Sequence, residues 1–509
     1  METLGKLLTS TWAAVITALL LITVYIINPS AIETLQLKTF DYFITSLDKK
    51  ESEEVVIVEF GEKSVQQFGQ WPFDRRDIAK TIDKLRDNGA AVIVVPVLFS
   101  ERDRAGGDAD LEMALRSTGV VISQAPTAQS RPPDAARRGF AAIGNAPDPW
   151  LYTWRGAVAP LPKLADAATG VGLLASTPER DGVVRRMPML ARIGNTLYPS
   201  LVLETLRTAA GDPSYQIKTG DAGVEAVRIP QFPTIETDEK GRIWLAWNNG
   251  FERIDATEIT KSKVENKIVI LGLTIEGVGG IIATPVGEKW AHEVQANALQ
   301  TLIDGTSISR ASYAHVVEIL ILLGMLVTML VLAPRLSVLL TVPFYILFVG
   351  VTGYGSYYLF TQSLQLWNPS YIILAGTFVY GQILFNNFAR EFRLKQQIKK
   401  QFGTYLSPAM VEKLQENPDL LKLGGETREL SIMFTDVRGF TSISEHYGAD
   451  VQGLTQIMNR YMTAMTAKIL QNEGTLDKYI GDAQMAFWNA PLDDADHAKH
   501  AVKTALEML

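Results

Sequence analysis

The sequence predicts a multidomain membrane protein with a large α/β domain outside the membrane, four transmembrane helices and a second, partial α/β domain inside. Three observations predict this architecture. Four apolar stretches have about the length of a membrane-spanning helix, strand-like and helical runs alternate between residues 30 and 310, and residues 425–509 have the pattern of a strand, a helix and a hairpin. A chain of 509 residues is also too long for one ordinary core.

The composition excludes several classes of function. The formal net charge is −7 and no long basic face offsets phosphate charge, which argues against nucleic acid as a partner. The chain has no cysteine, so disulfides, thiolate zinc sites and a cysteine nucleophile are excluded. It also has no GxxxxGK[ST] loop, H-E-x-x-H motif or serine nucleophile elbow.

The first apolar stretch, residues 11–27, carries no charge and is just long enough to cross a bilayer. A cleaved signal peptide is the alternative, because Lys6 precedes the stretch and Pro29-Ser30-Ala31 follows it, but the length favours a span. Three further stretches lie at about 316–333, 337–360 and 370–388. Buried core helices are the alternative here, and the scarcity of charges favours helices in contact with membrane lipid.

Basic residues after the last span set the orientation. They are Arg390, Arg393, Lys395, Lys399 and Lys400, and the positive-inside rule keeps them in the cytoplasm. Counting back predicts a multi-pass protein of the bacterial inner (plasma) membrane. Its predicted parts are a cytoplasmic N-terminus (1–10), a transmembrane helix (11–27), an extracytoplasmic domain (28–314), three transmembrane helices (315–388), a signalling helix with a connector (389–424) and a cytoplasmic domain (425–509).

In the extracytoplasmic domain, strand and helix patterns alternate. VVIVEF (55–60) is a predicted buried strand, residues 76–88 a helix ended by Gly89, and residues 90–99 the next strand. Further predicted elements are a helix at 110–116, strands at 119–123, 242–247 and 267–273, and a helix at about 293–302. This alternation predicts a largely parallel sheet.

Several segments of this domain resemble the second class of CHASE extracytoplasmic sensor domains. They are GQWPFDRRDIAKTIDKLRDNGAAVI, the D-x-D-L motif at 108–111, ERDGVVRRMPML, YPSLVLETLR and KIVILGLTIEG followed by ATPVGE. The resemblance covers roughly the whole outer region and implies a sensor for an unknown extracytoplasmic ligand. Two departures, Phe60-Gly61 and Val95-Pro96, stand where the family tends to carry an Asp. They weigh against a shared polar ligand or cation pocket.

Two polar groups of this domain have alternative interpretations. Trp71, Arg75 and Arg76 either contact a ligand or form a structural turn in which the arginines cap neighbouring carbonyls. We favour the turn, because Trp-Pro before a helix already explains the residue types. Asp181-Gly182 is interpreted as a tight turn between strands rather than as a site.

The linker is predicted as one basic helix from residue 384 to residue 406, with no breaker before Pro408. Its apolar residues fall near a coiled-coil stripe: Phe388, Phe392, Ile398, Phe402 and Tyr405. We favour a parallel dimer helix that passes motion inward. The alternative is an amphipathic helix lying on anionic lipid, which the three lysines at 395, 399 and 400 would also suit.

The cytoplasmic domain begins with a predicted strand at 429–437, whose continuous apolar run 432–434 suggests a central strand buried on both faces. Asp436 lies at its end, where a buried carboxylate needs a cation or strong donors. Ser442 and Glu445 fit a capping box that opens a helix. The free N–H groups and positive dipole end of such a helix suit phosphate oxygens.

A predicted hairpin follows, with strands at 475–480 and 483–488. Its turn, Gly481-Asp482, leaves Asp482 free to face Asp436, and two such carboxylates can hold a pair of divalent cations against a nucleoside triphosphate. Strand alternation predicts two faces, with Lys478 and Ile480 on one and Asp477 and Tyr479 on the other. Lysine only donates hydrogen bonds, so Lys478 suits an acceptor such as adenine N1.

The segments FTDVRGFTSISE and DKYIGDAQMAFWNAP resemble class III nucleotidyl cyclases. The resemblance implies that Asp436 and Asp482 are the catalytic metal ligands for two Mg²⁺ or Mn²⁺ ions, with the backbone carbonyl of Val437 as a further ligand. One metal would activate the ribose 3′-hydroxyl and the other would neutralise the β- and γ-phosphates. No general-base side chain is obvious in the sequence.

The same resemblance implies the substrate contacts and the fold. Gly439, Phe440 and Thr441 match the turn whose amides hold the triphosphate, and Lys478 matches the residue that selects adenine. The implied fold is a ferredoxin-like α/β domain that acts as a homodimer, with each active site built across the interface. The segment FGTYLSPAMVEKL upstream is similar to the connector of membrane-bound bacterial members.

The leading hypothesis is therefore a receptor adenylate cyclase that makes 3′,5′-cyclic AMP and pyrophosphate from ATP under control of an external signal. The alternative is a non-catalytic membrane sensor whose cyclase-like end is an interaction module. A histidine kinase is excluded because the linker has no histidine. The sequence stops at Leu509 before the family's third motif, so we expect a truncated piece of a longer enzyme with little or no turnover of its own.

One other group of side chains suits a metal by residue type: Asp493, Asp494, Asp496, His497 and His500. An acidic helix start explains the aspartates without a metal, and we favour that interpretation.

Overall fold

The computed structural model describes residues 11–117, 119–134, 139–402, 411 and 427–509. The chain divides into two compact units, residues 15–380 and residues 1–14 with 381–509, and each is described by itself. The predicted N-terminal segment 1–10 lies outside the described residues. So do Tyr405, Pro408 and most of the predicted connector, and no side chain of residues 398–402 is described.

The outer part of the first unit is built on a seven-stranded sheet. Its strands are β1 (Lys50–Phe60), β2 (Val92–Val95), β3 (Val120–Thr127), β6 (Gly156–Val158), β7 (Gly170–Leu173), β15 (Asn249–Asp255) and β16 (Ile268–Leu273). The order is β15–β1–β16–β2–β3–β6, with β7 paired to β3, and only the β3–β6 pair is antiparallel. The prediction of a largely parallel sheet is confirmed. Strand β2 is shorter than predicted because Pro96 has no N–H for a ladder.

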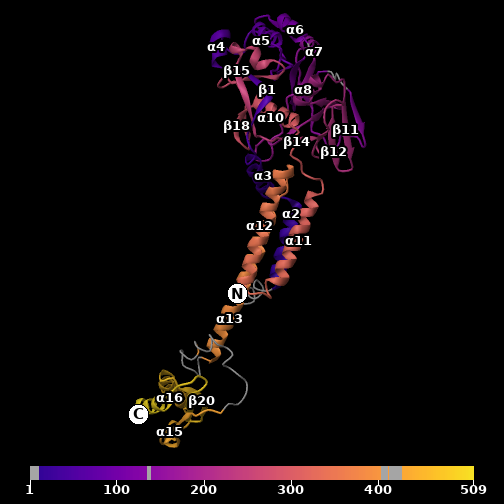
Figure 1. The fold of residues 1–509 in the computed structure, drawn as a ribbon. Coiled ribbons are helices and arrows are strands. Elements are labelled where there is room, and N and C mark those ends of the chain that lie inside the picture. Colours follow the sequence, from indigo (N-terminus) through magenta and orange to yellow (C-terminus); the bar gives the residue numbers. More distant parts are fainter. Residues whose placement is uncertain (1–10, 118, 135–138, 403–410, 412–426) are drawn as a thin grey trace. The chain divides into compact units, whose positions relative to one another are not determined.

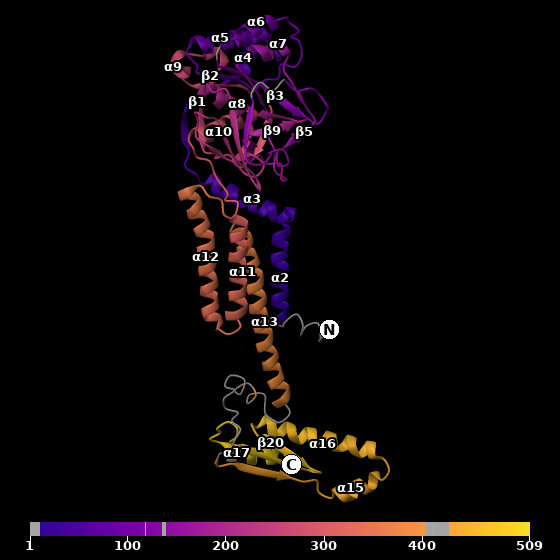
Figure 2. The ribbon, with the colours of Figure 1, turned by 90° about the vertical axis from the view of Figure 1, so that its right-hand side faces the viewer.

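Side-chain alternation along β1 supplies two cores, one on each face of the sheet. Val56, Val58 and Phe60 belong to the core that contains α5 (Arg75–Asp87), α6 (Asp108–Leu115) and α7 (Pro162–Ala167). Val55 and Ile57 belong to the core that contains α8 (Leu201–Ala210) and α10 (Ala291–Ile303). The sheet is thus buried on both faces, as parallel sheets are, and Figures 1 and 2 show helices on both sides of it. The helices α5, α6 and α10 confirm three predicted helices.

Smaller elements surround this sheet, and most of them are not evident in the sequence pattern. Four small sheets contain β10 (Thr196–Pro199), β9 (Leu190–Ile193) and β5 (Thr153–Trp154); β13 (Ile235–Glu236), β12 (Gly223–Arg228), β11 (Tyr215–Gly220) and β4 (Phe140–Ile143); β14 (Arg242–Trp244) and β8 (Arg186–Pro188); and β17 (Ile281–Thr284) and β18 (Gly287–Trp290). Short helices occur at α4 (Glu62–Phe68), η1 (Ala256–Glu258) and α9 (Lys261–Val264). The strand predicted at 242–247 is confirmed only in its first half, as β14.

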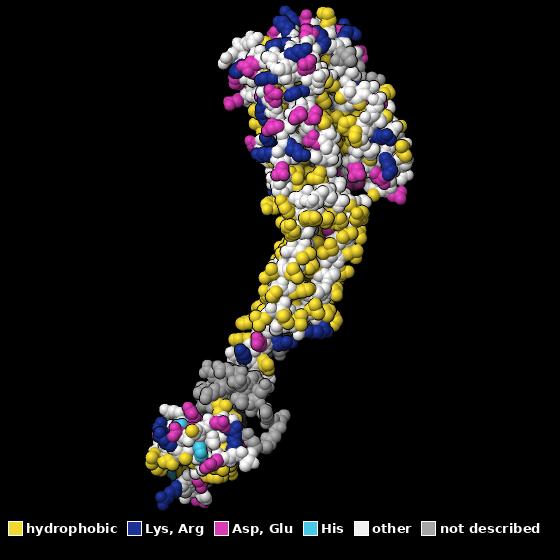
Figure 3. All heavy atoms as spheres, in the orientation of Figure 1, with side chains coloured by type: hydrophobic (Ala, Val, Ile, Leu, Met, Phe, Trp, Pro, Cys, Tyr) yellow, Lys and Arg dark blue, Asp and Glu magenta, His cyan; other side chains and the backbone are white. Residues whose placement is uncertain are grey.

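Among the described residues, three helices are long and apolar enough to cross a membrane: α11 (Ala314–Leu332), α12 (Val338–Ser363) and α13 (Ser370–Phe402). They coincide with the three predicted later spans. Helix α2 (Thr11–Ile27) meets α3 (Ser30–Thr45) at a 75° bend, and this pair makes a fourth candidate if it counts as one broken span. Figure 2 shows α2, α11, α12 and α13 side by side, and in Figure 3 hydrophobic side chains cover the visible surface of these helices.

A buried carboxylate joins the ends of three of these segments. Glu318 of α11 accepts hydrogen bonds from the Tyr25 hydroxyl of α2 (2.5 Å) and from the backbone N–H of Asn368 just before α13 (2.7 Å). The Arg310 guanidinium donates to both of its oxygens, at 3.0 and 2.8 Å. Because Glu318 is almost fully buried, these donors are what stabilise its charge.

The second unit contains a small three-stranded antiparallel sheet. Its elements are β19 (Ser431–Thr435), α15 (Phe440–Tyr447), α16 (Val451–Gln471), β20 (Thr475–Ile480), β21 (Ala483–Trp488) and α17 (His497–Met508). The strand order is β19–β21–β20. Ile469 of α16 packs with Leu476, Ala486 and Trp488 in a small core, and α17 contributes Ala501 and Met508 at its edge.

The prediction that the first strand is central and buried on both faces is wrong for the described residues. Strand β19 lies at the edge of the sheet, and helices cover only one face. On the other face, Ile432 is 54% exposed and Phe434 is 65% exposed. The apolar run therefore reflects one buried face and one uncovered apolar face.

Candidate active site

The two predicted carboxylates lie at the same end of the small sheet. Thr435, the last residue of β19, pairs with Gln484 of β21. Asp436 directly follows Thr435, and Asp482 sits in the turn just before β21, so antiparallel pairing brings both to one end. Asp436 is exposed and Asp482 is half-buried. Neither has a hydrogen bond or ion pair within the part of the chain that the structure describes.

Tyr461 of α16 lies near both carboxylates. Burial raises the pKa of its hydroxyl, and the negative charges of Asp436 and Asp482 raise it further. Both carboxylates thus act on the same phenol, which is consistent with their position at one end of the sheet. The sequence analysis missed Tyr461, although its spacing from Leu454 and Met465 puts it on the sheet-facing side of α16.

The predicted phosphate turn forms the start of α15. The helix begins at Phe440, and Gly439 is its N-cap with φ of +72°, a conformation that favours glycine. The predicted capping box at Ser442 is wrong: the N-cap is Gly439, three residues earlier, with no side-chain cap. The N–H of Phe440 donates to the carbonyl of Val437 at 3.2 Å. Since a carbonyl has two lone pairs, Val437 keeps one for a cation.

Lys478 projects from the open face of β20. It pairs across the ladder with Met485, and its ammonium lies 3.2 Å from the carboxylate of Asp477. A register shift between Leu476 and Lys478 makes Asp477 the extra residue of a bulge. The predicted sharing of one face by Asp477 and Tyr479 is therefore wrong. Leu476 and Tyr479 face the helices, and the Tyr479 hydroxyl contacts Thr466 of α16 at 2.9 Å.

The residues at this end of the sheet fit a hard divalent cation. They offer two unpartnered carboxylates and a backbone carbonyl, which are the oxygen ligands that Mg²⁺ and Mn²⁺ prefer. The carboxylate oxygens of Asp436 and Asp482 accept no hydrogen bond from the described residues, and the Val437 carbonyl keeps one free lone pair. All three groups can therefore coordinate such an ion.

A second group of side chains lies at the other end of β21. Glu473, Asp494 and His500 each bring one ligand atom within 4.8 Å of the others. The His500 ring accepts or donates a 2.8 Å hydrogen bond with Asp494, and Asp494 also accepts from the Asp496 N–H. The remaining members of the predicted metal-type group have partners of their own: Asp493 pairs with Arg428, and His497 contacts Ser431. These bonds hold the start of α17 in place.

In the outer domain, the arginines after Trp71 have structural partners. Arg75 is buried, pairs with Asp108 and donates to the carbonyl of Glu101. Arg76 donates to the carbonyl of Ala105. Both arginines thus cap carbonyls, as the interpretation of this segment as a turn predicts.

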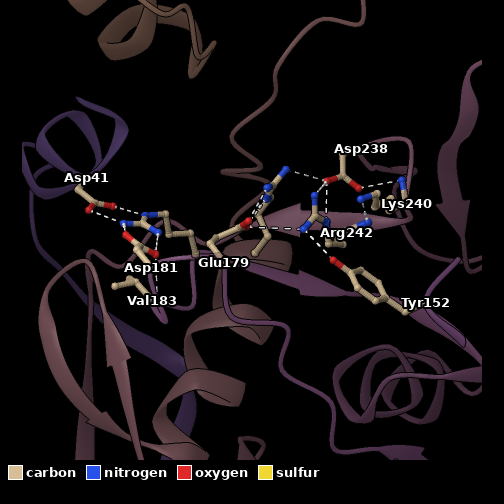
Figure 4. A network of polar contacts seen from close by, with 10 residues as sticks. Asp41, Tyr152, Glu179, Asp181, Val183, Asp238, Lys240 and Arg242 are labelled. Carbon is tan, nitrogen blue, oxygen red and sulfur yellow. Dashed lines mark hydrogen bonds and ion pairs between the residues drawn. The ribbon is translucent and has the colours of Figure 1, made fainter. Parts of the chain in front are cut away.

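Asp181 is more than a turn residue. The fully buried guanidinium of Arg185 donates two hydrogen bonds to Asp181 (2.8 and 2.7 Å) and two to Asp41 of α3 (2.5 and 2.8 Å). Figure 4 shows Asp41 and Asp181 near each other in this network. The bonds from Arg185 hold the pKa of Asp181 at about 2. This ion pair fastens α3, which follows the first membrane helix, to the outer domain.

A neighbouring network continues from this point. Glu179 binds Arg186 through two bonds of 2.7 and 2.9 Å, and Asp238 bridges Arg186 and Arg242. Figure 4 also shows Tyr152, whose hydroxyl lies 3.1 Å from Arg242. Each charge in this network has an opposite partner, so the network serves the structure and leaves no group free for a ligand.

Two family models match separate parts of the chain. Residues 15–333 match the family model described as the CHASE2 domain, and residues 425–509 match that of the adenylate and guanylate cyclase catalytic domain.

Among curated proteins, adenylate cyclase 1 of Rhizobium meliloti (strain 1021) is 31% identical over 105 residues, which are 21% of this chain and 16% of the relative. The adenylate cyclase of Anabaena cylindrica is 30% identical over 128 residues, 25% of this chain and 24% of the relative. The chain thus aligns with about a quarter or less of each of these relatives' length. The crystal structure of the adenylyl cyclase CyaB from P. aeruginosa shares 34% identity, covers 16% of this chain and 40% of that one, and has a TM-score of 0.15.

Proposed function

Because this chain belongs to the CHASE2 domain family and carries an adenylate and guanylate cyclase catalytic segment, we propose that it is a membrane receptor that converts ATP to 3′,5′-cyclic AMP and pyrophosphate. The observation that carries the proposal is the pairing of β19 with β21, which brings Asp436 and Asp482 to one end of the sheet without partners. Two of the relatives described above are named adenylate cyclases, which supports ATP over GTP.

In the proposed mechanism, Asp436, Asp482 and the Val437 carbonyl hold two Mg²⁺ or Mn²⁺ ions, which supply Lewis-acid activation and charge neutralisation when bound. The first turn of α15 offers unsatisfied N–H groups at Thr441 to phosphate oxygens. Gly439 lets a phosphate approach the backbone of the turn closely. A side chain at this position would occupy the open space beside the turn, and its backbone conformation would be strained.

Two further side chains bear on which nucleobase binds and on the negative charge around the cations. Lys478 stands on the open face of the sheet with its side chain 60% exposed, and it donates to adenine N1. Tyr461 is a neutral phenol at neutral pH, as tyrosine ordinarily is, and burial raises its pKa further, so it adds no negative charge beside the two carboxylates. Asp436 and Asp482 thus remain the main negative charges that the cations meet.

The proposed active form is a homodimer with ferredoxin-like domains. The elements β19, α15, α16, β20, β21 and α17 follow in the order expected for the first part of such a domain. The face with Ile432, Phe434 and Ile480 is apolar and uncovered in one chain. A second catalytic domain would remove this surface from water. We also propose that the CHASE2 domain is extracytoplasmic, that the cyclase is cytoplasmic, and that an external ligand regulates it.

The test measures cyclic AMP made by the full-length protein in membranes with Mg²⁺ or Mn²⁺. We expect Asp436→Asn to lower the output by about 100-fold or more, because removing a metal ligand costs several kcal/mol of transition-state stabilisation. Glu445→Gln is the matched control, since Glu445 is an exposed acid on the neighbouring helix. Equal output from Asp436→Asn and the parent, while the parent is active, would remove the mechanism. An inactive parent would instead favour an interaction module.

A further inference from the structure

Helix α13 carries two apolar stripes, and only one of them has a partner among the described residues. The first stripe is buried and comprises Ile372, Ala375, Val379 and Ile383. The second, which we call the outward stripe, comprises Leu374, Phe378, Gly381, Phe385, Phe388 and Phe392, all exposed. At about 100° per residue, the two stripes centre on nearly opposite sides of the helix.

The spacing of the outward stripe is that of a helix pair. Its members are separated alternately by four and three residues over the whole stripe. A mean of 3.5 residues is the repeat with which two helices keep the same side facing each other. Contact with lipid alone imposes no such repeat. The rings of Phe388 and Phe392 already stack within one helix, with centroids 6.3 Å apart, and so form a continuous aromatic surface.

The outward stripe also continues past the length that lipid can cover. A span that starts at Ser370 needs about 20 residues to cross the hydrocarbon core, which brings it to about residue 389. Phe392 lies beyond that point, beside Arg390 and Arg393, and is 53% exposed; Phe388, at the boundary, is 66% exposed. Contact with a second helix would remove these two aromatic side chains from water.

We propose that the outward stripe is the contact surface for a second copy of this chain, with two α13 helices paired in parallel from inside the membrane into the linker. This inference rests on the proposed homodimer and locates its seam. A Cβ at Gly381 would meet no atom within 4 Å, so this side of the helix is open and lets two backbones approach closely. The sequence placed the start of a coiled coil at Phe388; the structure extends the same stripe back to Leu374.

The absence of cysteine makes this seam directly testable. Single substitutions Phe385→Cys, Phe388→Cys and Phe392→Cys report on the outward stripe, and Asn387→Cys and Leu394→Cys report on the other side of the same turns. A disulfide needs Cβ atoms about 4 Å apart, so mild oxidation in membranes selects the facing positions. We expect several-fold more covalent dimer from the three stripe variants than from the two controls. Equal yields on both sides, higher yields from the controls, or no dimer from any variant would overturn the seam.

A second pair of variants tests the apolar contact itself. Phe388→Glu added to Phe385→Cys should lower the covalent dimer several-fold, because it brings two like charges together in the seam. Asn387→Glu added to the same background should leave the yield unchanged. Equal effects of the two glutamates would contradict a specific seam.

The same assay separates this inference from the proposed activity. In an Asp436→Asn background the crosslinking pattern should be unchanged, since the seam does not use the metal site. A stripe-specific pattern in a protein without cyclase activity would refute only the proposed function. Cyclase activity together with equal crosslinking of the stripe variants and the control variants would refute only the seam.

Discussion

The buried ion pair between α3 and the outer domain makes a sharp stability prediction. Arg185 has no exposed surface and donates four hydrogen bonds, two to Asp41 and two to Asp181. Arg185→Met retains only the apolar stem of the side chain and leaves two nearly buried carboxylates without the guanidinium between them. Breaking a buried pair in this way costs about 3–5 kcal/mol. Lys38, 3.4 Å from Asp41 and 3.8 Å from Asp181, offsets part of this loss and favours the lower end.

The pH dependence gives this prediction a distinctive sign. In the parent, Arg185 holds the pKa of Asp181 at about 2, below its ordinary 3.8. The stabilisation is therefore fully present above about pH 4 and is lost as the pH falls from about 4 to about 2. The difference corresponds to roughly 2 kcal/mol. In Arg185→Met the two carboxylates repel each other, and protonation relieves this repulsion. The difference in the free energy of unfolding between parent and variant therefore shrinks as the pH falls.

Thermal unfolding of the purified chain in detergent measures both effects. We expect the Tm of Arg185→Met to fall by about 6–15 °C at pH 7. The matched control is Arg86→Met, because Arg86 is exposed and its pairs with Asp83 and Asp87 are worth less than about 1 kcal/mol each. A Tm for Arg185→Met no lower than that of Arg86→Met would refute the reasoning. So would a gap between variant and parent that stays constant from pH 5 to pH 3, where the Asp181 stabilisation of the parent begins to be lost.

Three further predictions concern other parts of the chain. Lys478→Glu should reduce the preference for ATP over GTP by about tenfold or more, measured as competing product formation, because a carboxylate accepts from guanine N1–H and repels adenine N1. Trp488→Ala should destabilise the small catalytic segment by about 3–5 kcal/mol in denaturant unfolding, since the indole is fully buried and its N–H donates to Asn472 at 2.8 Å. Glu318→Leu should destabilise the membrane helices by about 3 kcal/mol in detergent by leaving Arg310 unpaired, and Arg310→Leu added to it should restore most of the loss.

The order of elements could be predicted from the sequence where a local pattern decides it. The continuous apolar runs at β1 and β16 and the helix that Gly89 ends all follow from residues within a few positions of each other. The three later membrane helices follow in the same way from length and low charge. The end of β2 was missed by four residues, because the predicted strand ran through Pro96.

Features that depend on distant partners could not be predicted. Whether Ile432 and Phe434 are covered depends on what packs on the sheet, and the apolar run alone does not tell one covered face from two. The ion pair of Arg185 with Asp41 joins residues 144 positions apart, so Asp181 was interpreted as a turn residue. Tyr461 was missed because it lies in no motif and meets the carboxylates only through the packing of α16 on the sheet.

Binding of Mn²⁺ to the full-length protein in the presence of a non-reactive ATP analogue, followed by electron paramagnetic resonance, tests the central claim most directly. If Asp436 and Asp482 hold the ions together, Asp436→Asn and Asp482→Asn should each abolish most of the bound Mn²⁺, and Glu445→Gln should retain it. Bound Mn²⁺ that survives both aspartate substitutions but disappears in Asp494→Asn would contradict the claim. That result would move the metal to the opposite end of β21.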